Sequence, residues 1–160
     1  IRFTETYLLK SPFQEAGASR SIDLYAESLQ AVSTLPAAMA RKGPLDFAQP
    51  GSYSHQIKVF YPADWKPAFV GDETVHASSA FDFRRKVSIG PEQVDLDYAF
   101  NVKRREVAAT DTTVHIEQLR SVRDDISARF SFNVVAPTSG KEREQRIRAL
   151  LRDMQPEAGK

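Results

Sequence analysis

Apolar and polar residues alternate along residues 80–102, and this alternation predicts a β-hairpin. The expected strands are residues 81–89 and 94–102, joined by the loop Gly90-Pro91-Glu92-Gln93. Because every second side chain of a strand points to the same face, the apolar residues of both strands form one continuous face. A slip of one residue would turn them all to the opposite face, so the register is well specified. We expect this hairpin to be the structural centre of the chain, and it carries no group of residues suited to catalysis.

The loop length sets the pairing between the two strands. With Ile89 opposite Val94, the apolar partners that follow are Val87 with Leu96, Phe83 with Phe100, and Phe81 with Val102. On the other face Lys86 falls opposite Asp97, a pair of opposite charges that contributes about 0.2–1 kcal/mol relative to a pair of alanines. Arg85 is the exception, since the register places it on the apolar face opposite Tyr98. We expect it to reach solvent at the end of the sheet or to stack on the ring.

The rest of the chain predicts further strands and three helices. Strands are expected at residues 1–10, 45–47, 56–61, 66–79 (with a loop at Gly71-Asp72) and 130–135. Helices are expected from Ser19 or Ser21 to about Thr34, over residues 113–128, and over residues 139–154 after the capping box Ser139-Gly140-Lys141-Glu142. Strand-helix-strand alternations are few. The pattern therefore predicts an α+β fold, with an antiparallel β-sheet or β-sandwich and about three peripheral helices.

Length and composition narrow the class of protein. The 160 residues correspond to one domain, which we expect to be a single β-rich accessory domain over residues 1–155 with a disordered tail at 156–160. Apolar residues make up 41% and charged residues 27%, as in ordinary globular proteins. No stretch approaches about 18 consecutive apolar residues, so we expect no membrane insertion by this segment. The net charge of +1 argues against nucleic acid as a partner.

The first residues and the lack of cysteine add two expectations. The chain begins at Ile1 inside an alternating pattern, which we interpret as a fragment of a longer protein whose signal peptide, if any, lies upstream. No cysteine is present, which excludes a disulfide scaffold, a cysteine zinc site and a cysteine nucleophile within these residues.

Candidate catalytic groups are scattered. His55, His76 and His115 do not stand at metal-ligand spacing, and no serine lies in a Gly-x-Ser-x-Gly motif. Asp95 and Asp97 share one face of a strand, as paired carboxylates would, but basic residues of the facing strand favour solvated charge pairs. We therefore predict no catalytic residue, metal or cofactor in this chain.

One binding surface is a candidate. It comprises Trp65 and the basic residues at the strand ends, Arg84, Arg85, Lys103, Arg104 and Arg105. The basic groups could attract an anionic partner, although lysine and arginine at strand ends also discourage pairing between sheets. The Trp65 ring could stack on a ligand or cover the core.

The order of these features resembles the C-terminal region of bacterial transglutaminase-like proteins, in which a domain of unknown function precedes a transglutaminase core. The matching features, over about four fifths of the chain, are Tyr7-Leu8, a helix around Leu29, Arg41-Lys42-Gly43-Pro44-Leu45, a strand from Ile57 through Pro62 to Trp65, and the hairpin at residues 81–102. The resemblance implies papain-type Cys-His-Asp chemistry in the core. None of those catalytic residues matches a position of this chain.

The resemblance therefore implies a non-catalytic C-terminal accessory domain that packs on or modulates the core. Its partner would be the missing upstream transglutaminase-like domain of the same chain. The family also implies the bacterial periplasm or cell envelope, with the cytoplasm as the alternative. Two other functions stay open: a stand-alone binding module for a peptide, glycan or anionic partner, and a small enzyme whose site the sequence does not reveal.

Overall fold

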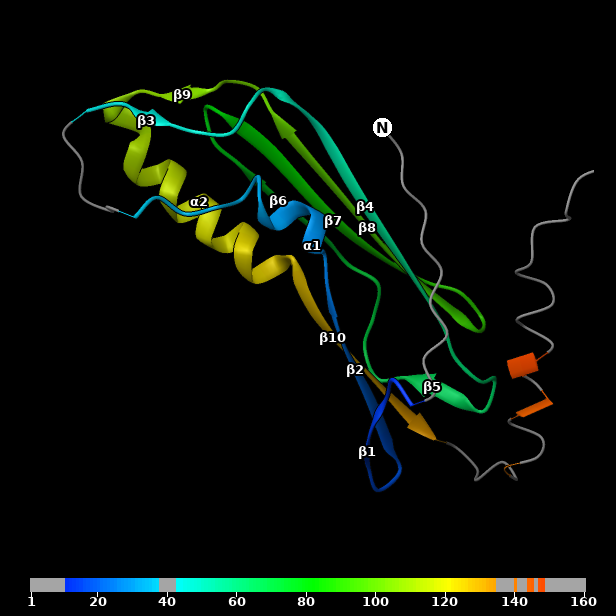
Figure 1. Cartoon of the computed structure of the whole chain (residues 1–160). Helices are drawn as coiled ribbons and strands as arrows, with labels where there is room; N and C mark the ends of the chain where they lie inside the picture. Colours follow the sequence, from blue (N-terminus) through cyan, green and yellow to red (C-terminus); the bar gives the residue numbers. More distant parts are fainter. Residues whose placement is uncertain (1–10, 38–42, 135–139, 141–143, 146, 149–160) are drawn as a thin grey trace, which may run out of the picture. The chain divides into compact units, whose positions relative to one another are not determined.

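The computed structural model describes residues 11–37 and 43–134, together with residues 140, 144, 145, 147 and 148. These residues contain ten strands in three sheets, two α-helices and one short 3-10 helix (Figure 1). All the strand pairs whose register is given are antiparallel, so the α+β prediction is confirmed. The strands are β1 Gln14–Ala16, β2 Ser19–Tyr25, β3 Leu45–Asp46, β4 Gly51–Phe60, β5 Trp65–Pro67, β6 Glu73–Ala77, β7 Phe81–Ile89, β8 Gln93–Val102, β9 Glu106–Val107 and β10 Ser127–Val134. The helices are α1 Glu27–Gln30, η1 Ala109–Asp111 and α2 Thr112–Asp125.

The chain divides into two compact units. Described residues up to Asp23, residues Asp64–Phe69 and those from Arg129 belong to the first unit. Residues Leu24–Ala63 and Val70–Ala128 belong to the second unit, which contains the predicted hairpin. The prediction of a single domain over residues 1–155 stays a prediction.

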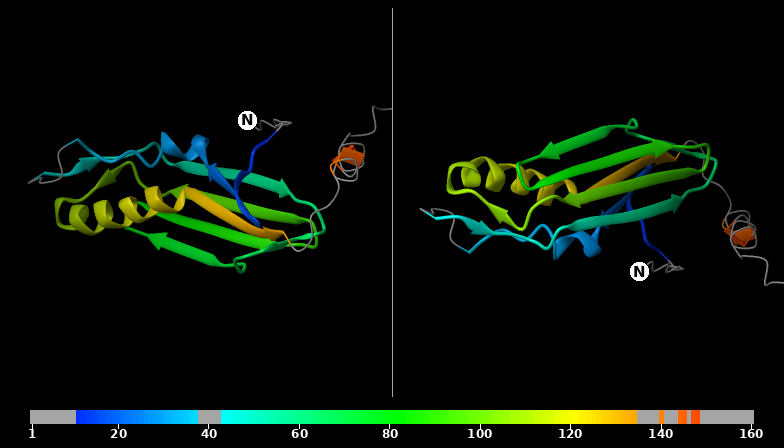
Figure 2. Two further views of the ribbon diagram at one scale, coloured as in Figure 1. Left: turned by 90° about the horizontal axis from the view of Figure 1, so that it is seen from below. Right: turned by 90° about the horizontal axis from the view of Figure 1, so that it is seen from above.

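The hairpin forms the middle of a four-stranded sheet with the order β4-β8-β7-β6 (Figure 2). Its register is the predicted one, from Ile89 opposite Val94 to Phe81 opposite Val102. Strand β4 extends the sheet beside β8, with Val59 opposite Val94, and it begins five residues before the predicted strand at 56–61. The two hairpin strands are therefore both interior strands of the sheet.

The inner face of this sheet holds the core of the second unit. Its buried side chains from the hairpin are Phe81, Phe83, Val87, Val94, Leu96, Tyr98, Phe100 and Val102. Helix α2 covers this face with Ile116, Leu119 and Val122, which recur every three or four residues and are all buried. The helix occupies residues 112–125 where 113–128 was predicted, and Ile126 is buried just after its end.

Two short elements close the ends of this core. Strand β3 pairs with β9, with Leu45 opposite Val107, which confirms the predicted short edge strand. Leu45 and Val107 pack with Ala80 and Ile116 in one buried cluster, against which the Phe47 ring is packed. Helix α1 lies beside β4, where Ser28 Oγ and His55 Nδ1 are 2.7 Å apart.

The first unit contains a second four-stranded sheet with the order β1-β2-β10-β5. Gly17 has a φ of +59° and forms the turn between β1 and β2, a conformation that glycine adopts without steric cost. Its core is aromatic: the Trp65 and Phe132 rings are buried, with centroids 5.8 Å apart, and Phe13 meets both edge-on. Phe69 stacks on Phe130 with ring centroids 4.5 Å apart.

The predicted helix from residue 19 or 21 to about Thr34 is wrong. Residues 19–25 form strand β2, and only Glu27–Gln30 are helical. Ile22 and Leu24 alternate with Ser21 and Asp23, so the segment fits a strand as well as a helix. Pairing of β2 with β1 and β10 decides between the two, because sheet partners can override a local helical pattern.

Other predicted boundaries also shift. The single strand expected at residues 66–79 is two strands, β5 and β6, which belong to different sheets. The last strand begins at Ser127, three residues before the predicted start at Phe130. Two α-helices are present in the described residues where about three were expected. The strand at 1–10, the tail at 156–160 and most of the helix at 139–154 lie outside those residues.

Within the described residues, no helix has both the length and the apolar character that crossing a bilayer requires.

Candidate functional site

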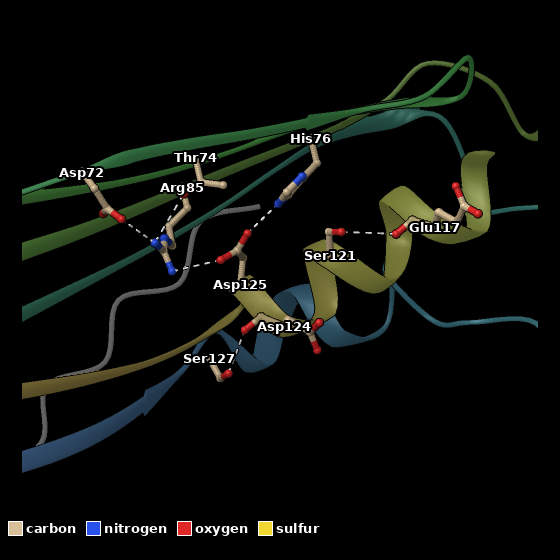
Figure 3. Close-up of polar contacts among 9 residues, drawn as sticks. All are labelled: Asp72, Thr74, His76, Arg85, Glu117, Ser121, Asp124, Asp125 and Ser127. Atoms are coloured by element: carbon tan, nitrogen blue, oxygen red, sulfur yellow. Dashed lines mark hydrogen bonds and ion pairs between the residues drawn. The ribbon is translucent and has the colours of Figure 1, made fainter. Parts of the chain in front are cut away.

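A group of polar side chains lies between α2 and the inner face of the β4-β8-β7-β6 sheet, and we call it the Arg85 cluster. Its members are Asp72, Thr74, His76, Arg85 and Asp125 (Figure 3). Asp72 precedes β6, Thr74 and His76 lie on β6, Arg85 lies on β7, and Asp125 is the last residue of α2. The cluster thus gathers polar groups from the sheet and from the end of the helix.

Arg85 and Asp125 are the central pair of the cluster. One guanidinium nitrogen of Arg85 lies 3.2 Å from Asp125 Oδ1, and the other lies 2.8 Å from Asp72 Oδ2 and 3.4 Å from Thr74 Oγ1. The second carboxylate oxygen of Asp125 lies 2.5 Å from His76 Nε2. Both oxygens of Asp125 are therefore bound to groups of the sheet.

This arrangement fixes the end of α2 to the sheet. A carboxylate at the C-terminus of a helix is repelled by the helix dipole. The ion pair with Arg85 offsets this repulsion for Asp125. The side chains of Arg85 and Asp125 are only 15% and 23% exposed, which strengthens their attraction relative to a surface pair. Chemically, the cluster can orient the His76 ring through a carboxylate, as general bases are often oriented.

Tyr98 lies directly opposite Arg85 in the sheet, and its burial shows that water is largely excluded from this region. Burial raises the pKa of the Tyr98 hydroxyl to about 12; Arg85 opposes this shift and Asp125 adds to it. The hydroxyl donates a long hydrogen bond of 3.4 Å to the carbonyl of Ile126. The predicted position of Arg85 on the apolar face is confirmed, and the carboxylates of Asp72 and Asp125 accommodate its charge there.

Replacing Asp125 with alanine is expected to lower the free energy of unfolding by about 1–3 kcal/mol. The change leaves Arg85 and His76 without a shared acceptor in a half-buried place, while Asp72 still binds the guanidinium. Urea unfolding followed by circular dichroism measures the difference. Asp46→Ala is the matched control, because its ion pair with Arg105 is exposed to solvent and such pairs contribute little to stability. Equal losses in the two variants would contradict the structural role of the cluster.

A second polar group is fully enclosed in the core. His115 of α2 is 0% exposed, and the rings of Phe47 and Phe81 meet it edge-on, with centroids 4.5 and 5.3 Å away. Its Nδ1 lies 3.0 Å from Ser78 Oγ. Burial lowers the pKa of His115 from 6.5 to about 4, so the ring is neutral at neutral pH.

The contacts of Ser78 favour one tautomer of the His115 ring. Ser78 Oγ accepts hydrogen bonds from the backbone N–H groups of Ala80 and Phe81. Its own proton is then free to be donated to His115 Nδ1, which places the imidazole hydrogen on Nε2. That Nε2 is buried and has no hydrogen-bond partner in the described residues. A second proton would have to bind Nδ1, where it would displace the hydrogen bond from Ser78 and place a charge in the core, so it would be costly.

The basic residues singled out from the sequence lie on different surfaces. Arg84 lies on the outer face of the sheet between Val75 and Ala99, whereas Arg85 lies on the inner face. Lys103 Nζ lies 2.9 Å from Asp82 Oδ1, and Arg105 Nε lies 3.0 Å from Asp46 Oδ1. Arg104 is exposed and makes no ion pair within the described residues. The structure thus separates Arg84 from Arg85, and whether any of these groups binds a partner stays a prediction.

Trp65 belongs to the first unit. Its side chain is packed against Phe13 and Phe132, and the residue is 4% exposed. The ring covers part of an aromatic core and is not an open stacking platform in this conformation.

The two aspartates of β8 form solvated contacts on the outer face. Asp95 lies 3.6 Å from Lys58 Nζ and accepts hydrogen bonds from Gln93. Asp97 accepts a hydrogen bond of 2.6 Å from Gln56 and lies opposite Lys86, as predicted. Asp95 thus forms a charge pair, but with Lys58 of β4, and Asp97 makes no ion pair within the described residues. The expected pairs with basic residues of the facing strand β7 are not formed there.

Sequence reasoning placed Arg85 correctly but missed its acidic partners. Asp72 lies in a predicted loop, and Asp125 lies at one end of a helix whose packing the sequence does not specify. One signal was available: Asp125 and Ile126 are adjacent at the predicted helix end, so a buried Ile126 brings Asp125 close to the sheet.

The chain was also compared with known proteins. No family model, no curated protein and no solved structure matches it.

Proposed function

We propose that this chain is a non-catalytic C-terminal accessory domain of a bacterial transglutaminase-like protein. In this proposal it packs on or modulates a papain-type Cys-His-Asp core located upstream in the same polypeptide. The parent protein would act in the periplasm or cell envelope. The proposal begins from the family resemblance of the sequence, and the fold adds support to it in two ways.

The order of elements is the first support. The resemblance calls for a helix near Leu29, a strand that ends before Pro62, an alternating hairpin, and then a helix. The described residues contain α1, β4, the β7-β8 hairpin and α2 in that order. The predicted register of the hairpin holds from its loop to its far end.

The second support, and the observation that carries the proposal, is the structural use of the hairpin and its polar neighbours. The inner face is filled by aromatic and aliphatic side chains, and the Arg85 cluster fixes α2 against it. The His115 ring is enclosed by Phe47 and Phe81. The polar and titratable side chains of the Arg85 cluster and the His115 ring thus serve to hold the second unit together. This use suits a scaffold that supports the activity of another domain.

The full open reading frame tests the proposal. We expect it to encode a cysteine, a histidine and an aspartate upstream of Ile1 in the order and context of a transglutaminase-like core. The parent protein and a version lacking these 160 residues are then compared for incorporation of a fluorescent amine into casein. Removal of the chain is expected to change the rate or the stability of the core. The isolated chain is expected to be inactive.

Two results would refute the proposal. One is a reading frame that encodes no such core. The other is amide hydrolysis or amine transfer by the isolated chain. A parent protein whose core cysteine is replaced by alanine serves as the control, since it keeps the accessory domain and should lose all activity.

A further inference from the structure

We propose that the open edge of the β4-β8-β7-β6 sheet, strand β6, pairs with β6 of a second copy of this chain. The two strands would run antiparallel across a two-fold axis at Val75, and the two sheets would become one. This inference rests on the second unit alone and does not depend on the proposed function.

The two edges of the sheet differ. Helix α1 lies beside β4, and its Ser28 is hydrogen-bonded to His55 of that strand (Figure 2). Strand β6 ends the sheet on the other side, and no strand of the described residues pairs with its outer edge. An uncovered edge offers unpaired N–H and C=O groups that can accept another strand.

The backbone of β6 shows which groups are available. Ser78 N–H donates to Phe81 O, and Val87 N–H donates to Asp72 O, so the even-numbered residues of β6 face β7. Because the direction alternates along a strand, the N–H and C=O groups of Glu73, Val75 and Ala77 point away from the sheet. These three residues can form about six backbone hydrogen bonds with an antiparallel copy of the same strand.

The side chains along this edge lack the usual protection. Val75 of β6 is 62% exposed, although it is a large hydrophobic residue. Natural edges are commonly protected by charged side chains or proline, and Glu73 is the one charged residue within β6.

On the inner side of the same edge, one flank of α2 is uncharged as well. Asp125 faces His76 of β6 (Figure 3), so residues four, seven and eleven positions before it lie along the same side of the helix. Those residues are Ser121, Gln118 and Val114, and Val114 is 56% exposed. An antiparallel copy would bring two uncharged flanks toward each other.

The register centred on Val75 also avoids like charges. Val75 meets Val75 of the second copy, and Glu73 meets Ala77 of the second copy. The two Glu73 side chains then lie about 13 Å apart along the strands, too far for strong repulsion. On the inner face, Thr74 meets His76 of the second copy. The strand is therefore complementary to itself, as an isologous interface requires.

Cysteine cross-linking tests the register, because the chain has no cysteine of its own. Hydrogen-bonded antiparallel residues have Cα atoms about 5.5 Å apart, within the range of about 4.4–6.8 Å that a disulfide spans. Val75→Cys is expected to give a covalent dimer on mild oxidation. Thr74→Cys is the matched control, since its Cα atoms would lie roughly 7–8 Å apart and should not be bridged efficiently.

Analytical ultracentrifugation of the unmodified chain tests the association itself. We expect a monomer-dimer equilibrium that Val75→Pro abolishes, because that proline removes an N–H directed outward and no ladder bond within the sheet. Ile89→Glu, at an exposed position at the other end of the hairpin, should leave the dimer intact. A chain that stays monomeric at all concentrations, a dimer unaffected by Val75→Pro, or equal cross-linking at positions 74 and 75 would overturn the proposal. Circular dichroism confirms that each variant is folded.

Discussion

Replacing Phe100 with alanine is expected to lower the free energy of unfolding by about 3–5 kcal/mol, the range measured for large-to-small changes in closely packed cores. The residue is 1% exposed and lies on β8, an interior strand of the sheet. Its ring stacks on Phe81 with centroids 5.1 Å apart, and it also contacts the rings of Phe83 and Phe47. Removing it leaves a cavity among three aromatic rings that cannot easily close.

Chemical denaturation of the wild-type chain and the variant measures this loss. The control is Ile89→Ala on β7, where the side chain is 37% exposed near the loop of the hairpin. That change is expected to cost much less, because truncations at exposed positions usually alter stability by about 0.5 kcal/mol or less. If Phe100→Ala cost no more than Ile89→Ala, the hairpin would not be the main core of the second unit.

Acidification is expected to destabilise the protein through His115. The folded structure holds the pKa of this ring at about 4, whereas the unfolded chain has the ordinary value of 6.5. Below pH 6.5 the unfolded state therefore binds a proton that the folded state does not. The stabilisation is complete above the unfolded pKa and is lost as the pH falls toward the folded pKa. The loss reaches about 3 kcal/mol at pH 4.

The pH dependence is isolated by comparing the wild-type chain with His115→Leu. The leucine fills the same core position and does not titrate, although it leaves the Ser78 hydroxyl without its acceptor and lowers stability by a similar amount at every pH. His55 also has a pKa lowered by burial, and it contributes equally to both proteins. The difference in unfolding free energy between the two proteins should shrink, or change sign, from pH 7 to pH 4. A constant difference would show that His115 accepts a proton in the folded state as easily as in the unfolded chain.

The hairpin could be predicted from the sequence because two independent patterns agree there. The period-two apolar residues specify the buried face, and the length of the loop, with Lys86 placed opposite Asp97, indicates the register. The apolar stripe of α2 could be predicted for a similar reason, since Ile116, Leu119 and Val122 fit only a helix. In both elements the local pattern and the tertiary partners require the same structure.

The segment at residues 19–34 could not be assigned in this way. Ile22, Leu24, Tyr25 and Leu29 fit a helical stripe, while the first two also fit a strand. The outcome depends on β1 and β10, and β10 lies about a hundred residues further along the sequence. A single sequence contains no direct information about such a long-range pairing.

The Arg85 cluster was predictable only in part. The register placed Arg85 on the apolar face, and a buried arginine requires an acidic partner. Which carboxylate pairs with Arg85 depends on the angle at which α2 packs on the sheet, and the sequence does not specify that angle. The enclosure of His115 had a weaker signal, since its position beside Ile116 on the buried stripe of α2 could have indicated a core histidine.

Hydrogen exchange of the folded chain tests the central claim most directly, which is that the β7-β8 hairpin is the scaffold of the second unit. Amides in the interior of a stable core exchange only when the whole unit opens. The account predicts that the slowest amides of the second unit lie in β7 and β8, and that those of α1 exchange faster. Amides of β7 and β8 that exchange as fast as those of α1 would contradict it.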